Sequence, residues 1–366
     1  MTNDVWVEVD LGALKHNLQQ VKGAVGDRVR LMAVVKANGF GHGYVEPARA
    51  FVEAGADALA VTRLGEALTL RSGGIDAPIL LFAPVQSDNA EEAVAAGLEL
   101  TVTGLTLAQS ISHAAEKLGK TVRVHAKVDT GMGRLGVLPN DTGPLLKALA
   151  GLPGIEVAGI YTHFATAAEK DLGASKEQFR RFADVLGRLR SSGIDYGLAH
   201  AANSAAIIRL PEAQMDMVRP GTLLYGQYPS AHVPRTLDLK PTWTLKARIC
   251  DIRTLPPGAT VGYGGEFITK RETRTAIIPI GFADGFTLAP EGPIYRQSVL
   301  KFAAKKAKRD LSVEIRGVKA PVLGRVAMQM TVVDVTDIPA ASVGDEVTIP
   351  AMRIPTSALL PRVYVS

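Results

Sequence analysis

The chain has 366 residues, of which 47% are hydrophobic and 21% are charged, a composition typical of a folded globular protein rather than a disordered or fibrous one. At roughly 150 residues per domain, this length predicts two domains. The formal net charge of +5 is modest, and Lys and Arg are mostly interspersed with Asp and Glu, which argues against a nucleic-acid-binding protein.

The N-terminal residues MTNDVWVEVD include acidic side chains where a secretory signal would have a basic start and an apolar core. No apolar run approaches the ~18 residues needed to span a membrane. We therefore expect a cytoplasmic protein that does not enter membranes. The single cysteine, Cys250, excludes an internal disulfide, and its apolar neighbours predict a buried structural thiol rather than a nucleophile.

From the start to about residue 230, short β-branched runs alternate with longer helical patterns, such as residues 11–21 and 176–193 and a helix that begins near Tyr44. This alternation is typical of parallel βα architecture. About eight or nine such runs within roughly 230 residues favour a TIM barrel over an open sheet. The predicted strands are residues 6–10, 30–36, 56–62, 78–83, 99–104, 122–130, 156–164, 196–202 and 214–220.

After about residue 240 the strands follow one another without intervening helices, which predicts a separate all-β domain. The Pro- and His-containing stretch 228–241 is the predicted connector, and the predicted domains are residues 1–235 and 236–366. A basic, helix-like segment at 301–309 interrupts the β pattern and is interpreted as a solvated insertion. The predicted strands are residues 242–255, 273–282, 319–326, 330–338 and 345–350.

In a TIM barrel the reactive groups lie at the C-terminal ends of the strands, so polar residues that close apolar runs are the site candidates. Lys36 is the most informative, because a lysine that closes a buried strand must lose solvation and either lowers its pKa or forms a covalent adduct. A snorkelling rim lysine is the alternative, but the following ANGFGHG lets the backbone approach a ligand closely. The strand-end candidates are Lys36, Lys127, Asp129, His163, His200, Asn203, Ser204, Arg219 and Gly221.

The loops after the last two barrel strands commonly bind phosphate through backbone amides and a helix N-terminus. Asn203 and Ser204 stand where a helix begins, and Gly221 offers a turn. A lysine that can form a Schiff base beside a phosphate cradle predicts pyridoxal 5'-phosphate as cofactor. Arg219 would lie near the ring nitrogen, and because a guanidinium keeps its proton, the ring nitrogen would stay unprotonated. The weaker electron sink favours racemisation over transamination.

A series of motifs runs along nearly the whole length of the chain. They are WVEVDLGALKHNL, AVVKANGFGHG, VHAKVDTGMGRLGV, YTHFATA, HAANSAA, MVRPGTLLYG, VGYGGEF, IPIGFADGF and KAPVLGRVAM. In these motifs and in their order the chain resembles the alanine racemases, which implies a pyridoxal-phosphate enzyme that interconverts L- and D-alanine and supplies D-alanine for peptidoglycan.

The resemblance implies that Lys36 is the Schiff-base lysine and the acid/base for one enantiomer, with Tyr263 as the opposing acid/base. In the family this tyrosine comes from the partner subunit, so a homodimer with shared active sites is implied. A phenol titrates near pH 10, so Tyr263 needs help to act near neutrality. His163 is similar to the histidine that hydrogen-bonds this tyrosine, and His200 and Arg219 continue that network.

Further roles follow from the same resemblance, and no metal site is predicted. Arg134 resembles the arginine that binds the cofactor's phenolic oxygen and the substrate carboxylate. Lys127 resembles a lysine that is often carbamylated, which would turn a cation beside Arg134 into an anion. The phosphate-binding positions are similar to Ser204, Gly221 and Thr222, and the backbone N–H of Met328 to a group that receives the substrate carboxylate.

Several positions depart from the family pattern and leave the substrate range open. Phe40 replaces a tyrosine whose hydroxyl reaches the phosphate, and Phe282 replaces another frequent tyrosine. Gln329 and Ala168 replace aspartates, and the tail 349–366 lacks the tyrosine and glutamate that narrow the entrance. The alternatives are a serine or broad-specificity racemase, a non-catalytic cofactor-binding barrel, and a decarboxylase of the same fold, which Arg219 argues against.

Overall fold

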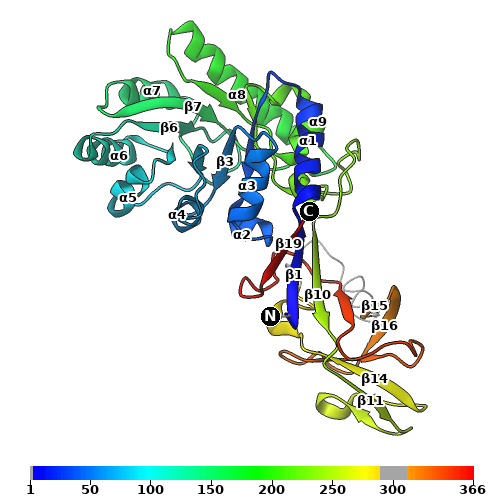
Figure 1. The fold of residues 1–366 in the computed structure, drawn as a ribbon. Helices are drawn as coiled ribbons and strands as arrows, with labels where there is room; N and C mark the ends of the chain where they lie inside the picture. Colours follow the sequence, from blue (N-terminus) through cyan, green and yellow to red (C-terminus); the bar gives the residue numbers. More distant parts are fainter. Residues whose placement is uncertain (1–2, 289–310) are drawn as a thin grey trace. The chain divides into compact units, whose positions relative to one another are not determined.

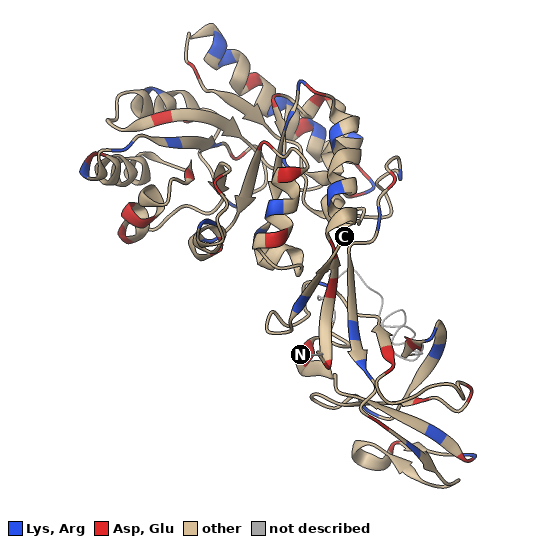
Figure 2. Ribbon diagram, viewed as in Figure 1, with Lys and Arg blue, Asp and Glu red and all other residues tan. Residues whose placement is uncertain are grey.

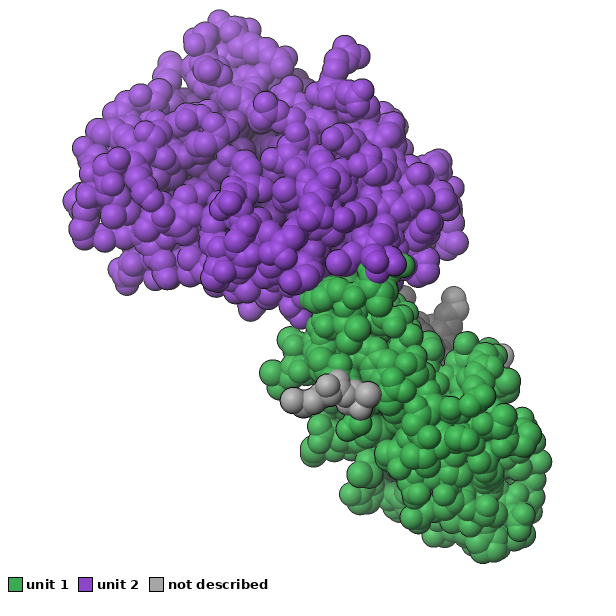
Figure 3. All heavy atoms as spheres, viewed as in Figure 1, with its two compact units in different colours: residues 1–10, 243–365 green, residues 11–242, 366 purple. Residues whose placement is uncertain are grey.

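The computed structural model describes residues 3–288 and 311–366, and the chain divides into two compact units (Figure 3). The barrel unit comprises residues 11–242 with Ser366, and the C-terminal unit comprises residues 1–10 and 243–365. The predicted division, 1–235 and 236–366, thus differs from the observed one at both ends. The basic segment 301–309 lies outside the described residues.

The barrel unit is built on a parallel eight-stranded sheet in the order β8-β7-β6-β5-β4-β3-β2-β9 (Figure 1). Backbone hydrogen bonds from Asp216 N to Ala199 O (3.1 Å) and from Arg219 N to Ala202 O (2.9 Å) join its two ends. The predicted TIM barrel is therefore confirmed. Its strands are β2 (Arg30–Val34), β3 (Ala58–Val61), β4 (Ile79–Leu81), β5 (Glu99–Val102), β6 (Val122–Lys127), β7 (Ile155–Tyr161), β8 (Leu198–His200) and β9 (Met217–Val218).

The helices of the barrel unit bury one apolar face each. In α8 (Gly173–Ser191) the buried residues Phe182, Val185, Leu186 and Leu189 recur at intervals of three and four, which places them on one helix face. The barrel interior is filled by side chains at every second strand position, such as Met32 and Val34. The other helices are α1 (Leu11–Val25), α2 (Lys36–Phe40), α3 (Val45–Glu53), α4 (Leu64–Ser72), α5 (Ala90–Ala95), α6 (Leu105–Leu118), α7 (Thr142–Ala150) and α9 (Ser204–Arg209).

The C-terminal unit contains a nine-stranded sheet in the order β11-β14-β17-β16-β15-β18-β10-β1-β19, which confirms the predicted all-β domain. A separate hairpin pairs β12 (Thr260–Val261) with β13 (Phe267–Ile268). The nine strands are β1 (Val5–Asp10), β10 (Trp243–Arg248), β11 (Asp251–Leu255), β14 (Thr273–Ile278), β15 (Ser312–Ile315), β16 (Val318–Leu323), β17 (Thr331–Asp334), β18 (Glu346–Ile349) and β19 (Arg362–Val365).

The first predicted barrel strand belongs instead to this second sheet, where β1 pairs antiparallel with β10 and parallel with β19. Trp6, Val7 and Val9 are buried, whereas Glu8 is half-buried and pairs with Lys246 at 2.8 Å. Barrel strands such as β3 are buried at every position. A strand covered on both faces is apolar throughout, so the polar side chains of β1 fit a sheet with one solvated face.

The prediction of a buried Cys250 is wrong, because the thiol is exposed. The predicted strand 242–255 breaks at Ile249 and Cys250, so this thiol lies in the connection between β10 and β11, where its Sγ donates to Ile277 O at 3.3 Å. Partial burial and the carboxylates of Asp251 and Asp4 raise the pKa of Cys250. A raised pKa keeps the thiol protonated and unreactive near neutrality.

Lys and Arg are interspersed with Asp and Glu along the helices of the barrel unit (Figure 2). Many of them pair on one helix face, as Arg180 does with Glu177 and Asp184. In the described part of the chain, no helix combines the length and apolarity that membrane spanning requires.

Candidate active site

Two adjoining cavities, of about 270 Å³ and 230 Å³, open at the C-terminal ends of the barrel strands. Both are lined by Lys36, Phe82, His163 and Arg219. The sequence-predicted candidates that line the larger cavity are Asn203, Ser204, Gly221 and Thr222, and those that line the smaller one are Lys127 and Arg134. The structure therefore brings the barrel candidates together around Lys36.

Lys36 begins a turn of left-handed helix, in which Ala37, Asn38, Gly39 and Phe40 have φ values of 54°, 55°, 55° and 53°. This conformation costs an L-residue roughly 1–2 kcal/mol each, and only Gly and to some extent Asn tolerate it. Asn38 and Gly39 therefore allow the backbone to form this strained turn, in addition to letting it approach a ligand closely. Such strain persists only where the surroundings hold the backbone in place.

The carboxylate of Glu66, in α4, holds this turn. Glu66 Oε1 accepts the backbone N–H of Ala37 at 2.8 Å and the hydroxyl of Tyr44 at 3.2 Å. Glu66 Oε2 accepts the backbone N–H groups of Thr62 (2.8 Å) and Arg63 (3.0 Å). Four donors on one carboxylate tie the residue after Lys36 to the end of β3.

Asn203, Ser204 and Gly221 line one part of the larger cavity, which is the predicted phosphate cradle. The Oγ of Ser204 accepts the N–H groups of Gly221 (2.9 Å) and Leu223 (3.4 Å), and Asn203 Oδ1 accepts those of Ala205 and Ala206 at the start of α9. A Cβ on Gly221 would come within 2.9 Å of Phe40 Cζ. The ring of Phe40 therefore packs close to Gly221, and the backbone N–H groups of both loops are bonded to Ser204 and Asn203.

Four cationic side chains line the two cavities, namely Lys36, Lys127, Arg134 and Arg219. Burial lowers the pKa of Lys36, and the charge of Arg134 lowers it further, against the opposing effect of Glu66. Burial, with help from Arg219 and Arg134, lowers the pKa of Lys127 to about 7. The cavity therefore attracts anions, while both of its amines lose protons more easily than exposed lysines do.

Arg134 lies in the loop after β6, which a single carboxylate shapes. Asp129 accepts the backbone N–H groups of Gly131, Met132 and Gly133 at 2.8–3.1 Å. These hydrogen bonds fold the loop back toward the barrel and hold the pKa of Asp129 below its usual range despite partial burial. Asp129, a strand-end candidate, therefore supports the loop that carries Arg134.

Arg219 is buried and held on two sides. Its Nη1 donates to His200 Nδ1 at 2.8 Å, and its Nη2 donates to Thr162 O (2.7 Å) and Ala201 O (3.2 Å). Burial lowers the pKa of Arg219 to about 10, so it keeps its charge at neutral pH. Burial, followed by the cations Arg219, Arg134, Lys127 and Lys36, lowers the pKa of His163 to about 3.

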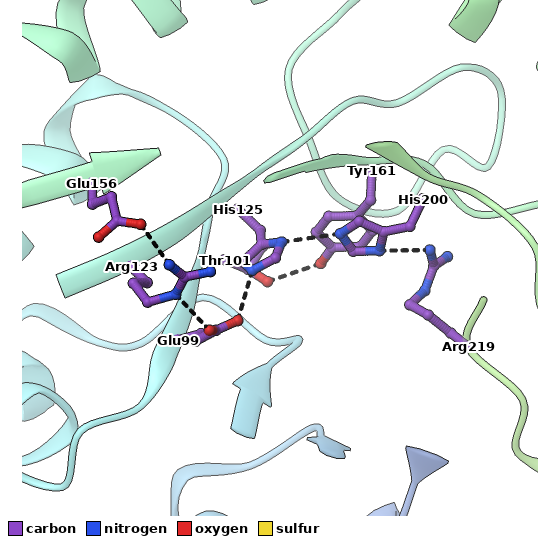
Figure 4. A network of polar contacts seen from close by, with 8 residues as sticks. All are labelled: Glu99, Thr101, Arg123, His125, Glu156, Tyr161, His200 and Arg219. Carbon is purple, nitrogen blue, oxygen red and sulfur yellow. Dashed lines mark hydrogen bonds and ion pairs between the residues drawn. The ribbon is translucent and has the colours of Figure 1, made fainter. Parts of the chain in front are cut away.

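Sequence reasoning missed four buried polar residues that support the site: Glu66, Glu99, His125 and Tyr161. Glu99 and His125 bond to each other at 2.8 Å, and Tyr161 stacks on His200 with centroids 4.9 Å apart (Figure 4). His125 and Lys127 are two positions apart in β6, so the period of a strand predicts that they share the inner face. The strand-end rule overlooked such positions because they lie deeper in the barrel.

Tyr263 and Met328, the two remaining candidates, lie in the C-terminal unit and are 74% and 61% exposed. Tyr263 begins a turn in which Gly262, Gly264 and Gly265 all have positive φ, between 59° and 75°. Phe282 and Gln329 are also exposed in this unit. Phe40 and Ala168 line the larger cavity of the barrel unit.

The barrel residues fit pyridoxal phosphate in charge and in shape. A phosphate dianion matches the positive charge of Lys36 and Arg219 in the larger cavity of about 270 Å³, which Ser204 and Gly221 also line. An aldehyde matches Lys36, whose lowered pKa favours the free amine that attacks carbonyls. The four cationic side chains that line the two cavities can attract a second anion as well, such as the carboxylate of an amino acid.

Known proteins match the whole chain. The family profiles "Alanine racemase, N-terminal domain" and "Alanine racemase, C-terminal domain" match residues 9–229 and 242–358. "Alanine racemase 2" of Caldanaerobacter subterraneus is 42% identical over 94% of this chain and 84% of its own length. The alanine racemase of Methanococcus maripaludis is 42% identical over 95% of this chain and 89% of its own.

Solved structures give the same result. The alanine racemase of Clostridium difficile has a TM-score of 0.90 and 31% identity, with 100% of this chain and 96% of that chain covered. The alanine racemase of Bacillus anthracis with bound L-Ala-P has a TM-score of 0.86 and 30% identity, with the same coverage.

Proposed function

The chain belongs to the alanine racemase family, and we propose that it interconverts L- and D-alanine with pyridoxal 5'-phosphate bound at the barrel mouth and with Lys36 and Tyr263 as its two acid/base groups. The observation that supports this best is the lowered pKa of Lys36 beside the Ser204 and Gly221 cradle. We expect a cytoplasmic enzyme whose D-alanine supplies peptidoglycan, as the resemblance implies.

The residues that would hold the cofactor are those that line the larger cavity, with Asn203, Ser204, Gly221 and Thr222 at its phosphate and Arg219 at its ring. When bound, the cofactor withdraws electrons from the substrate and so acidifies the hydrogen on its α-carbon. Arg134 and the backbone N–H of Met328 would bind the substrate carboxylate, which fixes the α-carbon between the two acid/base groups.

Lys36 and Tyr263 would then divide the proton transfers. The Lys36 amine accepts or returns a proton on one face of the α-carbon, and its lowered pKa leaves more of it in the basic form. Tyr263 serves the opposite face, where a neutral His163 would hydrogen-bond its hydroxyl. The low pKa of His163 supports this assignment, because a neutral imidazole can accept as well as donate.

We also propose that Lys127 is carbamylated, as the resemblance implies. In that reaction the neutral amine attacks carbon dioxide, an N–C bond forms, and one proton is released. A pKa of about 7 leaves much of Lys127 neutral at physiological pH. The resulting anion would relieve the repulsion between Lys127 and its neighbours Arg219 and Arg134. After burial, this repulsion is the next cause of the lowered pKa of Lys127.

The functional form would be a homodimer in which Tyr263 completes the site of the partner subunit. Among the described residues, twelve exposed large apolar side chains lie in the C-terminal unit and three in the larger barrel unit. Exposed apolar side chains at this density are typical of an association surface. They include Tyr263, Ile268, Phe282, Leu288, Met328, Met330, Ile354 and Leu359.

Mixing two inactive variants tests the activity and the shared site together. Lys36→Ala and Tyr263→Phe chains are unfolded and refolded with cofactor, alone and as an equal mixture. If each site combines residues of both chains, half of all dimers in the mixture contain one chain of each kind, and each of these has one intact site, which gives about a quarter of wild-type racemisation. No recovery in the mixture would contradict the shared site. No racemisation by wild type, assayed with alanine, serine and longer amino acids, would contradict the proposed activity.

A further inference from the structure

A continuous hydrogen-bonded chain runs from Arg219 into the barrel (Figure 4). Arg219 Nη1 lies 2.8 Å from His200 Nδ1, and His200 Nε2 lies 3.0 Å from His125 Nδ1. His125 Nε2 in turn lies 2.8 Å from Glu99 Oε2. The side chains of all four residues are buried.

The residues at the two ends of this hydrogen-bonded chain, Arg219 and Glu99, determine which ring nitrogen of each histidine carries a proton. A guanidinium only donates, so His200 Nδ1 must accept, and a neutral His200 must carry its proton on Nε2. That proton is donated to His125 Nδ1, so His125 also carries its proton on Nε2 and donates it to the Glu99 carboxylate. Burial, with the charge of Arg219 adding to it, lowers the pKa of His200 well below its usual value, in agreement with a neutral ring.

The barrel is shaped around this chain. A Cβ on Gly159 of β7 would lie 2.5 Å from His125 Nδ1, and the β6–β7 register shifts between Val124 and His125. The ring of Tyr161 stacks on His200 at an interplanar angle of 9°. Burial raises the pKa of Tyr161 to about 12, so this phenol stays neutral beside the two imidazoles.

Glu99 is held as an anion at the inner end. Burial alone would raise its pKa, but hydrogen bonds from His125 and Arg123 and the charge of Arg123 outweigh burial and lower it. Arg123 Nε donates to Glu99 Oε1 at 2.8 Å, so each oxygen of the carboxylate accepts one hydrogen bond. On the outer side, Arg123 Nη1 contacts Glu156 Oε1 at 2.5 Å.

We propose that Glu99 and His125 are positioning residues that fix the tautomer of His200 and thereby hold Arg219, oriented and charged, at the cofactor ring. This inference rests on the proposed function for its consequence, but its geometry lies wholly within the barrel unit. A carboxylate that orients one imidazole is a familiar device at metal and catalytic sites. Here it would act through two imidazoles in series on a cation.

Replacing the carboxylate with an amide should reverse the chain. Glu99→Gln has one acceptor oxygen and one donor nitrogen, and Arg123 can only donate, so the oxygen must face Arg123. The amide N–H₂ then faces His125 Nε2, which must accept, and the proton of His125 moves to Nδ1. His200 is forced into the same change, which sets its Nδ1–H against the Nη1–H of Arg219.

The experiment is ¹⁵N NMR of histidine-labelled holoenzyme, in which protonated and unprotonated ring nitrogens are resolved. In wild type we expect His125 and His200 to be protonated on Nε2, and in Glu99→Gln on Nδ1. The matched control is Glu156→Gln, which removes a carboxylate from the same Arg123 but is not part of the chain, and it should keep the wild-type tautomers. Turnover should fall roughly 10–100-fold in Glu99→Gln with a smaller change in KM, and less than about twofold in Glu156→Gln.

An Nδ1 proton on either histidine of the wild type would overturn the proposal, and this arm remains decisive if Glu99→Gln does not fold. Unchanged tautomers in a folded Glu99→Gln protein would overturn it as well. Because the tautomers are read without an assay, these failures leave the proposed racemase activity intact. A wild type with the expected tautomers but no racemisation would contradict only the proposed function.

Discussion

Most candidate site residues of the barrel unit are buried or half-buried, with Arg134 as an exposed exception, whereas those of the C-terminal unit are exposed. Lys36 follows β2 in a turn that Glu66 holds, and Arg219 donates to three acceptors. Tyr263 lies 74% exposed in a turn of glycines. Under the proposed function, the barrel residues of one chain would preorganise cofactor binding, while Tyr263 would be positioned only in the proposed dimer.

The largest effect on racemisation should come from Lys36→Ala in the barrel unit. We expect racemisation to fall by at least about 10⁴-fold, and the visible absorbance of the protein-bound cofactor to be lost. The free energy of unfolding should hold or rise, because burial already disfavours the charged amine. Lys147→Ala, at an exposed lysine of α7, is the control and should change none of these quantities. An active, coloured Lys36→Ala protein would refute the assignment.

Tyr263→Phe tests the C-terminal unit, whose candidate residues are exposed. Removal of a general acid/base lowers turnover by roughly 10²–10⁴-fold. We expect α-hydrogen exchange from one enantiomer to fall more than from the other, and from L-alanine more than from D-alanine. Exchange is measured in deuterated water at each face, because the overall equilibrium couples the two net rates. The melting temperature should fall by at most a few degrees, since the change removes a single hydroxyl and its proposed hydrogen bond to His163. Equal exchange losses at both faces would count against a face-specific tyrosine.

The pH dependence of the free energy of unfolding tests whether the cationic side chains that surround Lys127 in the barrel unit lower its pKa. The pKa of Lys127 is about 7 in the folded protein and 10.5 as an unperturbed lysine. Between these values the unfolded chain binds more protons, so the free energy of unfolding should rise with pH from about 7 to about 10, by up to a few kcal/mol.

Denaturant unfolding of cofactor-free protein in buffers without carbon dioxide measures this rise, with Lys127→Met as the comparison. We expect the variant to lack this part of the rise. Added bicarbonate should raise the free energy of unfolding of the wild type but not of Lys127→Met, because a carbamate that forms only in the folded protein stabilises it by mass action. Parallel curves for the two proteins without bicarbonate would show that Lys127 is not the titrating group.

The sequence could predict those site residues that lie at the mouth of the barrel, but not the residues that support them from elsewhere in the fold. The strand-end rule found Lys36, His163 and Arg219 because the C-terminal ends of parallel strands meet at one barrel mouth. It missed Glu66, which acts on the backbone of a distant turn, and Glu99, which lies at the start of β5 below the mouth. It also placed β1 in the barrel, because a short strand before a helix looks the same whichever sheet it joins.

The smallest expected effect separates two explanations of Phe40, which stands where the family has a tyrosine. Its ring stacks on Tyr225 at 4.7 Å, and its Cζ borders Gly221 at the cradle. If only a phosphate hydrogen bond is missing, Phe40→Tyr should tighten pyridoxal phosphate binding by about 0.5–1.5 kcal/mol, or roughly 2–10-fold in Kd. Pyridoxal without its phosphate is the control and should bind both proteins equally. Equal gains in affinity for both ligands would mean that the hydroxyl acts on the strained turn at Lys36 instead. Unchanged Kd values would mean that the phosphate already has all the hydrogen bonds it needs.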